Sequence, residues 1–223
     1  MLDEKGKWYS KSVYLNEPPG KTFEYTNVGA TLAAHIIEVA TGEAYHDFTT
    51  KHILTPLGMN NSGWSFDKVD FSQHTKLYAT EQAQIPFYSL ITYPDGGLIT
   101  SIDDLSQYLV ELIRGYAGKG TLLTPSSYQE IFKPQLSETH FKERDNDRPY
   151  DDEYNAGIFM GFTPNGHIGH TGGDPGVSTF MFFNPELKIG RILMINTNLI
   201  NDKGVQQYFS IWDKLEEYQL QLQ

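Results

Sequence analysis

Hydrophobic residues in the first part of the chain recur at the three- and four-residue spacing of helices. Val28, Leu32, Ile36 and Val39 fall on one face of a helix that this spacing predicts over residues 27–40. Gly42 follows it and suits the left-handed conformation that ends many helices. A second helix is predicted over residues 45–54, where a Pro-Leu-Gly turn closes it.

The clearest helical pattern begins at Ser101. Its side chain can cap the helix, Asp104 stands at the third helical position, and leucines at positions 105, 109 and 112 keep the helical period. Gly115 can terminate this helix, and a Thr-Pro pair at 124–125 predicts a short helix through residue 132. Residues 60–97 lack a period but hold many aromatic side chains. A loop-rich segment of that length is either functional or packed by its own aromatics.

In the last third of the chain the period changes to that of strands. Alternation predicts strands over 154–162, 167–171, 177–183 and 189–197, followed by an amphipathic helix. Helices first and then an antiparallel meander closed by a helix predict an α+β fold. We expect one domain over residues 1–223, with a mainly helical lobe at 1–150 and an antiparallel sheet plus the C-terminal helix at 151–223. The apolar side of that helix carries Val205, Tyr208, Trp212, Leu215 and Leu222.

Composition narrows the function classes. The 223 residues are 39% hydrophobic and 13% aromatic, as expected of a globular core. The formal net charge of -11 argues against nucleic acid and against anionic membrane surfaces, both of which attract basic proteins. There is no cysteine, which excludes disulfides, thiolate zinc sites and cysteine nucleophiles. No stretch reaches transmembrane length, and the first ten residues lack the apolar core of a signal peptide.

The first motif with candidate chemistry is Tyr25-Thr26-Asn27, at the mouth of the first predicted helix. Its spacing lets Tyr25 and Asn27 project toward one cleft, next to the positive partial charge of the helix N-terminus. A tyrosine acts as a general base where a nearby cation lowers its pKa. The alternative interpretation is a core aromatic followed by a capping residue.

The second motif is His170-Thr171-Gly172-Gly173, at the end of a predicted strand. Small residues there let a ligand approach the backbone, which offers N–H groups to an oxyanion. Thr171 can hydrogen-bond a substrate carboxylate, and His170 can be a partly charged donor. The alternative interpretation is a glycine-rich turn between strands.

The order of these and further motifs resembles the serine β-lactamase-like superfamily, which includes class C β-lactamases, DD-carboxypeptidases and related esterases. The resemblance runs from Pro18 to the C-terminal helix and implies a β-lactamase/transpeptidase-like fold. It implies acyl transfer on a D-alanyl peptide, a β-lactam or a small ester, without a cofactor. The motifs in order are Tyr25-x-Asn27, Pro56-Leu57-Gly58-Met59, Gly96-Gly97-Leu98 and Gly169-His170-Thr171-Gly172-Gly173.

By this resemblance, Tyr25 is the general base and proton relay, and Asn27 orients the substrate amide. His170 and Thr171 begin the family's Lys-Thr-Gly or His-Thr-Gly strand, and Gly173 supplies an oxyanion N–H. The expected ligand is a small molecule or a peptidoglycan-like substrate, and the expected compartment is periplasmic or secreted if an upstream signal exists. The implied catalytic residues are Tyr25, Asn27 and His170, and the implied substrate-binding residues are Thr171, Gly172 and Gly173.

The family's nucleophilic Ser-x-x-Lys motif is not found before Tyr25. The lysine, one helical turn after the serine, can activate that serine as nucleophile, and the family places the motif well upstream of Tyr-x-Asn. The match at Ser65-Phe66-Asp67-Lys68 comes after Tyr25, in an expected surface loop too polar to open a buried helix. We therefore expect an N-terminally truncated domain that is inactive in isolation. The alternative is a non-catalytic domain that binds a ligand or a partner.

Two further expectations concern metals and assembly. The seven histidines form no HExxH motif. The odd spacing of His167 and His170 sends them to opposite faces of a strand, so no metal site is expected. In the family, N-terminal strands pair with the last strand of the sheet. Without them the edge at residues 189–197 would be unpaired, which predicts self-association.

Overall fold

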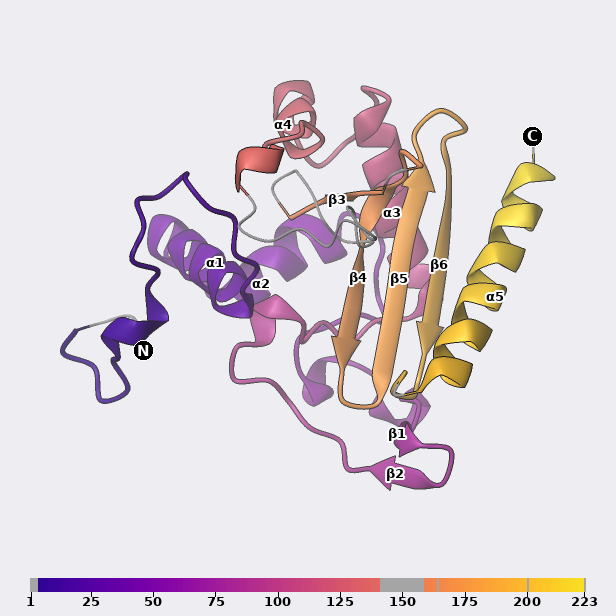
Figure 1. The fold of residues 1–223 in the computed structure, drawn as a ribbon, viewed down its shortest axis with the longest axis horizontal. Coiled ribbons are helices and arrows are strands. Elements are labelled where there is room, and N and C mark those ends of the chain that lie inside the picture. The colour runs from indigo at the N-terminus through magenta and orange to yellow at the C-terminus, as the bar shows by residue number, and fades with distance from the viewer. Residues whose placement is uncertain (1–3, 141–158, 164, 200, 223) are drawn as a thin grey trace.

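The computed structural model describes residues 4–140, 159–163, 165–199 and 201–222. Helices gather beside one edge of a four-stranded sheet, and a long C-terminal helix lies against the sheet (Figure 1). This arrangement confirms the predicted α+β class. The main helices are α1 (Asn27–Thr41), α2 (Tyr45–Thr49), α3 (Ile102–Tyr116), α4 (Pro125–Ile131) and α5 (Asp202–Leu220).

Local capping decides where the helices begin. The Thr26 hydroxyl oxygen accepts a hydrogen bond from the backbone N–H of Val28 at 3.2 Å, and α1 ends at Gly42, whose φ of 74° is left-handed. Ser101 caps α3 as predicted, and Thr124 caps α4. Helix α3 continues one residue past Gly115. The predicted second helix is divided into α2 and a π-helical turn at Thr50–Leu54.

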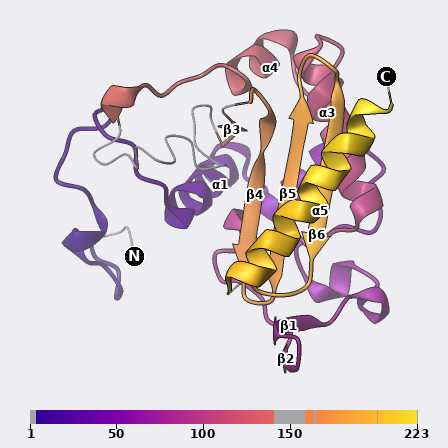
Figure 2. The same cartoon turned by 45° about the vertical axis from the view of Figure 1, so that its right-hand side comes forward.

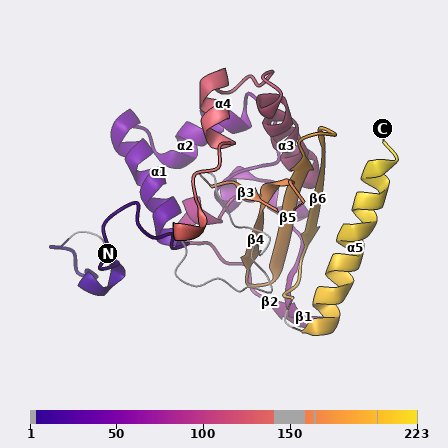
Figure 3. The same ribbon diagram turned by 45° about the horizontal axis from the view of Figure 1, so that its top comes forward.

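The sheet is antiparallel throughout, with the strand order β3-β4-β5-β6. Helix α5 lies across one face (Figure 2), and α3 packs on the other. Helix α1 lies on the β4 side of the sheet in each view (Figure 3). Of the strand predicted at 154–162, residues 154–158 lie outside the described residues, and of the remaining four only Gly161 and Phe162 form a strand. The strands are β3 (Gly161–Phe162), β4 (Ile168–Asp174), β5 (Val177–Asn184) and β6 (Ile189–Ile195).

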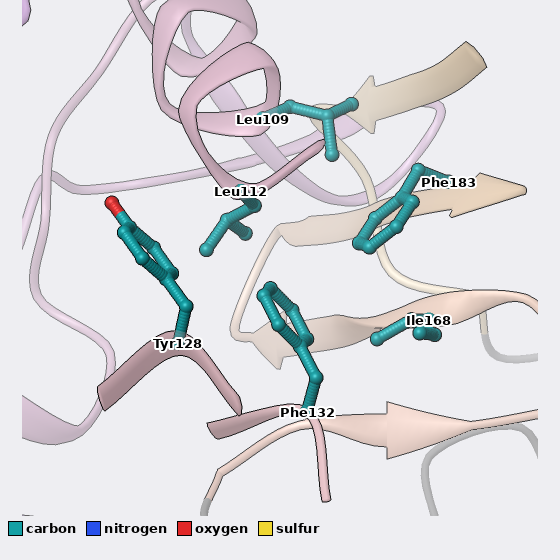
Figure 4. Close-up of a cluster of buried hydrophobic side chains, with 6 residues drawn as sticks. All are labelled: Leu109, Leu112, Tyr128, Phe132, Ile168 and Phe183. Carbon is teal, nitrogen blue, oxygen red and sulfur yellow. The ribbon is translucent and has the colours of Figure 1, made fainter. Parts of the chain in front are cut away.

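The main hydrophobic core joins α3 and α4 to the sheet (Figure 4). Phe183 has no solvent exposure, and its ring lies edge-on to those of Phe132 and Tyr116, with centroids 5.9 and 5.8 Å apart. Aromatic pairs in this geometry add to the free energy of burial itself. The core therefore fixes the start of β4, the strand that carries the second motif. Its buried members are Leu109, Leu112, Tyr128, Phe132, Ile168 and Phe183.

The segment at 60–97 contains a small hairpin as well as loops. Strands β1 (Leu77–Thr80) and β2 (Ala83–Ile85) pair with each other, so the lobe predicted as mainly helical also holds two strands. The backbone of Tyr78 bonds to Asn196 and Asn198, with N···O distances of 3.0 and 3.2 Å. This contact covers the far end of the predicted open edge. Within the described residues, β6 itself pairs only with β5.

The apolar face of α1 is largely exposed. Leu32, Ile36 and Val39 are 41%, 59% and 72% exposed, whereas Ala34 is 3% exposed and faces the interior. The helical spacing was read correctly, but in the described part of the chain most of this face remains in solvent. Helical periodicity identifies a face and does not show what covers it.

Candidate active site

The fold brings the two predicted motifs together. Tyr25, just before α1, has its ring centroid 6.5 Å from that of His170 on β4, with the ring planes tilted by 37°. The Tyr25 side chain is 51% exposed, so its hydroxyl group can reach a ligand. A tyrosine and a histidine whose side chains lie this close can exchange a proton through a substrate group bound beside them.

The alternative interpretation of the first motif does not hold. Tyr25 is exposed and therefore is no core aromatic, and the capping side chain is that of Thr26. Asn27 is the first residue of α1 and is exposed. Its amide group stands beside the helix N-terminus, where the backbone dipoles favour negative charge. Tyr25 and Asn27 thus lie where a polar ligand would meet the positive end of α1.

The second motif is part of a strand. Gly172 and Gly173 belong to β4, and the turn comes later, at Pro175-Gly176. Strand β3 pairs with β4 only at Ile168 and Gly169. Within the described residues, the edge of β4 from His170 to Asp174 is therefore open on the side that faces α1. An open edge offers backbone N–H and C=O groups to an extended ligand.

Strand alternation divides the predicted substrate-binding residues between two faces. His170 and Gly172 share the face of β4 toward α3, whereas Thr171 and Gly173 point to the face covered by α5. The residue paired with Thr171 is Phe180, whose ring contacts that of Tyr208 on α5 at 4.3 Å. The structure thus joins Tyr25 to His170 directly. Thr171 and Gly173 meet the same ligand only along the open strand edge.

The hydrogen bond of His170 orients its imidazole ring. Its Nδ1 atom lies within hydrogen-bonding distance of the carbonyl oxygen of Thr171. Because a carbonyl oxygen only accepts, Nδ1 is the donor in this contact, which leaves Nε2 for a contact with a ligand.

Two glycines of the motif region are required by packing, and one is not. A Cβ atom on Gly169 would lie 2.0 Å from the backbone oxygen of Met181, and one on Gly172 would lie 2.5 Å from the Thr179 hydroxyl oxygen. A Cβ atom on Gly173 would meet nothing within 4 Å. Gly169 and Gly172 are thus required by packing within the sheet, whereas Gly173 leaves the backbone accessible to a ligand.

A cavity of about 480 Å³ lies on the same sheet face as His170, near the β4–β5 turn. Val177 and Met194 line it from the sheet, and Trp64 and Tyr93 line it from the loops of residues 60–97. Asp174 also lines it, and burial, aided by nearby Asp95, raises the pKa of its carboxyl group. The sequence analysis does not predict this cavity, and the aromatic content of residues 60–97 is the one feature of the sequence that points to it.

Ser65 and Lys68 lie in a surface turn, as expected from their polar surroundings in the sequence. Ser65 precedes a short 3-10 turn at Phe66–Lys68, and its hydroxyl group donates to the Asp67 carboxylate at 2.6 Å. The Lys68 side chain is 62% exposed, and its ammonium nitrogen is 3.9 Å from a carboxylate oxygen of Asp67. Both groups therefore engage Asp67 in a surface turn, as the polar sequence predicted.

His167 and His170 lie in different environments. His167 is buried beside Glu216 of α5, while His170 faces Tyr25. Among the described residues, no three His, Asp or Glu side chains are placed to hold a metal ion. The described part of the chain also contains no helix long and apolar enough to cross a membrane.

Comparison with known proteins identifies the family. The family model described as Beta-lactamase matches residues 8–216, nearly the whole chain. The chain belongs to the beta-lactamase family. It is 26% identical over 195 residues to Protein flp of Staphylococcus aureus strain MW2, covering 82% of this chain and 35% of that protein. It is 22% identical over 209 residues to Unguisins hydrolase ungD' of Aspergillus campestris, covering 88% of this chain and 38% of that protein.

Solved structures share the fold. D-amino acid amidase from Ochrobactrum anthropi SV3 has a TM-score of 0.64 at 20% identity, covering 82% of this chain and 52% of that one. The penicillin binding protein from Bacillus halodurans also has a TM-score of 0.64, at 19% identity, covering 90% and 60%. These likenesses show a common β-lactamase-type fold. The chain spans little more than a third of the curated relatives it matches and about half of the solved ones.

Proposed function

We propose that this chain supplies the tyrosine, asparagine and His-Thr-Gly part of a serine hydrolase site. The reaction would be acyl transfer on a D-alanyl peptide, a β-lactam or a small ester. The observation that carries the proposal is the approach of the Tyr25 ring to the His170 ring, with centroids 6.5 Å apart. Membership of the beta-lactamase family supports a hydrolase, since relatives named for hydrolysis are among the matches.

In the proposed mechanism each group acts where the fold places it. Tyr25 relays the proton between the nucleophile and the leaving group, and His170 Nε2 accepts or returns a proton beside it. Asn27 holds the substrate amide at the positive end of α1. The backbone N–H of Gly173 stabilises the oxyanion of the tetrahedral intermediate, and the Thr171 hydroxyl group binds a substrate carboxylate from the open strand edge.

The nucleophile is the part that these residues do not supply in the family's order. We therefore propose that the 223-residue polypeptide by itself forms no acyl-enzyme. Fluorescent penicillin and a fluorophosphonate should leave its mass unchanged in intact-protein mass spectrometry. Covalent labelling would contradict this. A Ser65→Ala variant then identifies the attacking group, because loss of the label would assign the nucleophile to Ser65.

Substrate recognition has its own test. A D-Ala-D-Ala peptide should shift the backbone amide signals of His170 to Gly173 in an NMR titration, and the L-Ala-L-Ala peptide should shift them less. Thr171→Val keeps the shape of the side chain and removes its hydroxyl group, so it should weaken binding. Equal shifts with both peptides, or none, would contradict a D-alanyl ligand.

A non-catalytic binding domain is the second candidate function. It is favoured by the contacts of Ser65 and Lys68, because both members of the one Ser-x-x-Lys sequence in the printed chain engage Asp67 in a surface turn. Both functions use the same residues and differ in whether a serine and lysine are supplied. Sequencing the genomic DNA immediately upstream of the Met1 codon distinguishes them. An in-frame Ser-x-x-Lys favours the hydrolase, and an in-frame stop codon favours the binding domain.

We also propose that the polypeptide self-associates through the outer edge of β6. This strand is outermost in the sheet, and the contact with Tyr78 covers only its far end. An exposed row of backbone N–H and C=O groups is a template for pairing with another chain. Sedimentation velocity should show dimers that increase with protein concentration. A monomer across the micromolar range would contradict the proposal.

A further inference from the structure

Helix α5 is held against the sheet by two different kinds of contact. Its first half packs through aromatic rings, with Phe180 of β5 at 4.3 Å from Tyr208 and 5.7 Å from Trp212 between ring centroids. Its second half presents few buried apolar side chains. Tyr218 and Leu220 are 56% and 57% exposed. Polar contacts to the sheet must therefore hold that half in place.

Arg191 of β6 is the centre of these polar contacts. Its Nη1 atom donates to Glu216 Oε2 and to the backbone oxygen of Trp212, each at 3.0 Å. Its guanidinium group also lies 4.1 Å from the centroid of the Trp212 ring. Only 7% of the Arg191 side chain is exposed. One turn later along α5, Gln219 Nε2 donates to the backbone oxygen of Ile189 at 2.7 Å.

His167, the residue directly before β4, completes the cluster. Its Nε2 atom is 3.8 Å from Glu216 Oε1, and 8% of its side chain is exposed. Its backbone is fixed as well, because its N–H donates to the Thr163 hydroxyl oxygen at 3.0 Å and its C=O accepts from Thr163 N at 2.9 Å. The backbone of His167 is therefore held in place, with its imidazole largely buried.

With His167 neutral, the central contact of this cluster is a one-to-one ion pair between Arg191 and Glu216. Arg191 then carries one positive charge and Glu216 one negative charge. Asp213 on α5 is the further carboxylate that acts on Arg191. A proton on His167 would place a second, largely buried cation beside the buried Arg191, with the partly exposed Glu216 carboxylate shared between them. Burial lowers the pKa of His167, Arg191 lowers it further, and Glu216 partly opposes them.

We propose that His167, Arg191 and Glu216 form an acid-released latch that holds the C-terminal half of α5 on the sheet. Protonation of His167 opposes docking of this half, and the aromatic contacts keep the first half in place. Because His167 directly precedes β4, the pH would decide whether α5 covers the face of the sheet to which Thr171 points. The latch is independent of the proposed acyl transfer.

The direction of the pH effect follows from proton linkage. In the open state His167 has the ordinary pKa of about 6.5, and in the docked state its pKa is lower. The open state therefore binds more protons, so docking is most stable above about pH 6.5 and weakens as the pH falls. A single proton changes the opening equilibrium by at most about tenfold per pH unit.

Hydrogen–deuterium exchange at about pH 7.5 and about pH 5.5, corrected for intrinsic exchange rates, tests the latch. Peptides covering residues 213–220 should lose protection severalfold at the lower pH, while those covering 202–212 change little. His167→Gln should abolish the pH dependence. His35→Gln is the matched control, because His35 is an exposed residue 3.5 Å from Glu38 and its replacement should leave the effect intact.

Equal protection of residues 213–220 at both pH values in the wild-type protein would overturn the latch. So would a His167→Gln protein that keeps the wild-type pH dependence. If that variant does not fold, NMR titration of the wild-type ring decides the matter. A His167 pKa at or above about 6.5 refutes the proposal, and a lower value supports it.

Discussion

Glu111 on α3 is a buried carboxylate whose replacement by glutamine should destabilise the fold strongly. It is 2% exposed and accepts hydrogen bonds from Tyr128 Oη at 2.5 Å and from Leu122 N at 2.9 Å. The backbone N–H of Thr121 and its hydroxyl group donate to it as well, the latter at 3.2 Å. The carboxylate thus anchors the loop between α3 and α4 to the helix that supports β4.

The expected magnitude follows from these four donors. Three donors bond to Oε1, and only the Thr121 hydroxyl group, which can also accept, bonds to Oε2, so glutamine can keep all four contacts but loses the negative charge. The three hydrogen bonds to Oε1 then become neutral ones, at a loss of roughly 1 kcal/mol each, so Glu111→Gln should cost about 3 kcal/mol. The matched control is Glu130→Gln on α4. That side chain is 53% exposed, and its loss should cost less than about 0.5 kcal/mol.

Urea unfolding followed by circular dichroism at neutral pH measures the difference. With a denaturant slope near 3 kcal/mol per molar, the midpoint of Glu111→Gln should fall by about 1 M. Tyr128→Phe should also destabilise, and the double variant should lose less than the sum of the two single losses. A cost for Glu111→Gln below about 1 kcal/mol, equal to that of Glu130→Gln, would refute the reasoning.

The same variant has a predicted pH dependence. Burial alone would raise the pKa of Glu111, but the hydrogen bonds from Tyr128, Thr121 and Leu122 together hold it below its ordinary value. The folded state therefore favours the charged form. This stabilisation is present above about pH 4.5 and is lost as the pH falls through the lower pKa of the folded state. The stability gap between wild type and Glu111→Gln should narrow below about pH 4.5.

Two further predictions concern the sheet that carries the site. Gly169→Ala would place a Cβ atom 2.0 Å from the Met181 carbonyl oxygen and should lower the free energy of unfolding by more than about 2 kcal/mol. The Cβ atom of Gly173→Ala would meet nothing within 4 Å, and this variant should lose less than about 1 kcal/mol. Equal melting temperatures of the two variants would contradict this. Phe183→Ala should cost about 3–5 kcal/mol, because its fully buried ring would leave a cavity beside Phe132. A loss below about 1 kcal/mol in chemical denaturation would show that the core collapses to fill the space.

The sequence determined the local features of this fold because their causes are local. A side-chain cap and a left-handed glycine bound α1, and Ser101 and Thr124 start α3 and α4 where their capping chemistry predicts. Strand alternation located β5 and β6 within two residues of the observed bounds. A helix cap or a hydrophobic period depends on residues close to each other along the chain, so the sequence alone contains the information that locates these elements.

Burial and contact across the fold were decided by the tertiary structure. The face of α1 was predicted correctly, but its exposure depends on what packs against it. Thr26, and not Asn27, caps that helix, which the sequence could not separate because both side chains suit the position. The latch at Arg191 also escaped detection. Its one signal was a lone arginine in the apolar strand β6, whose partner Glu216 lies on a different element.

The candidate site shows the same division. The residue types and order of Tyr25-x-Asn27 and His170-Thr171-Gly172-Gly173 were sufficient to predict the family, and the match over residues 8–216 confirms it. Only the folded chain places the ring of Tyr25 at 6.5 Å from that of His170, and only the register of β4 turns Thr171 away from His170. The reason is physical. A motif specifies chemical groups, whereas their distances and directions depend on how the sheet and helices pack.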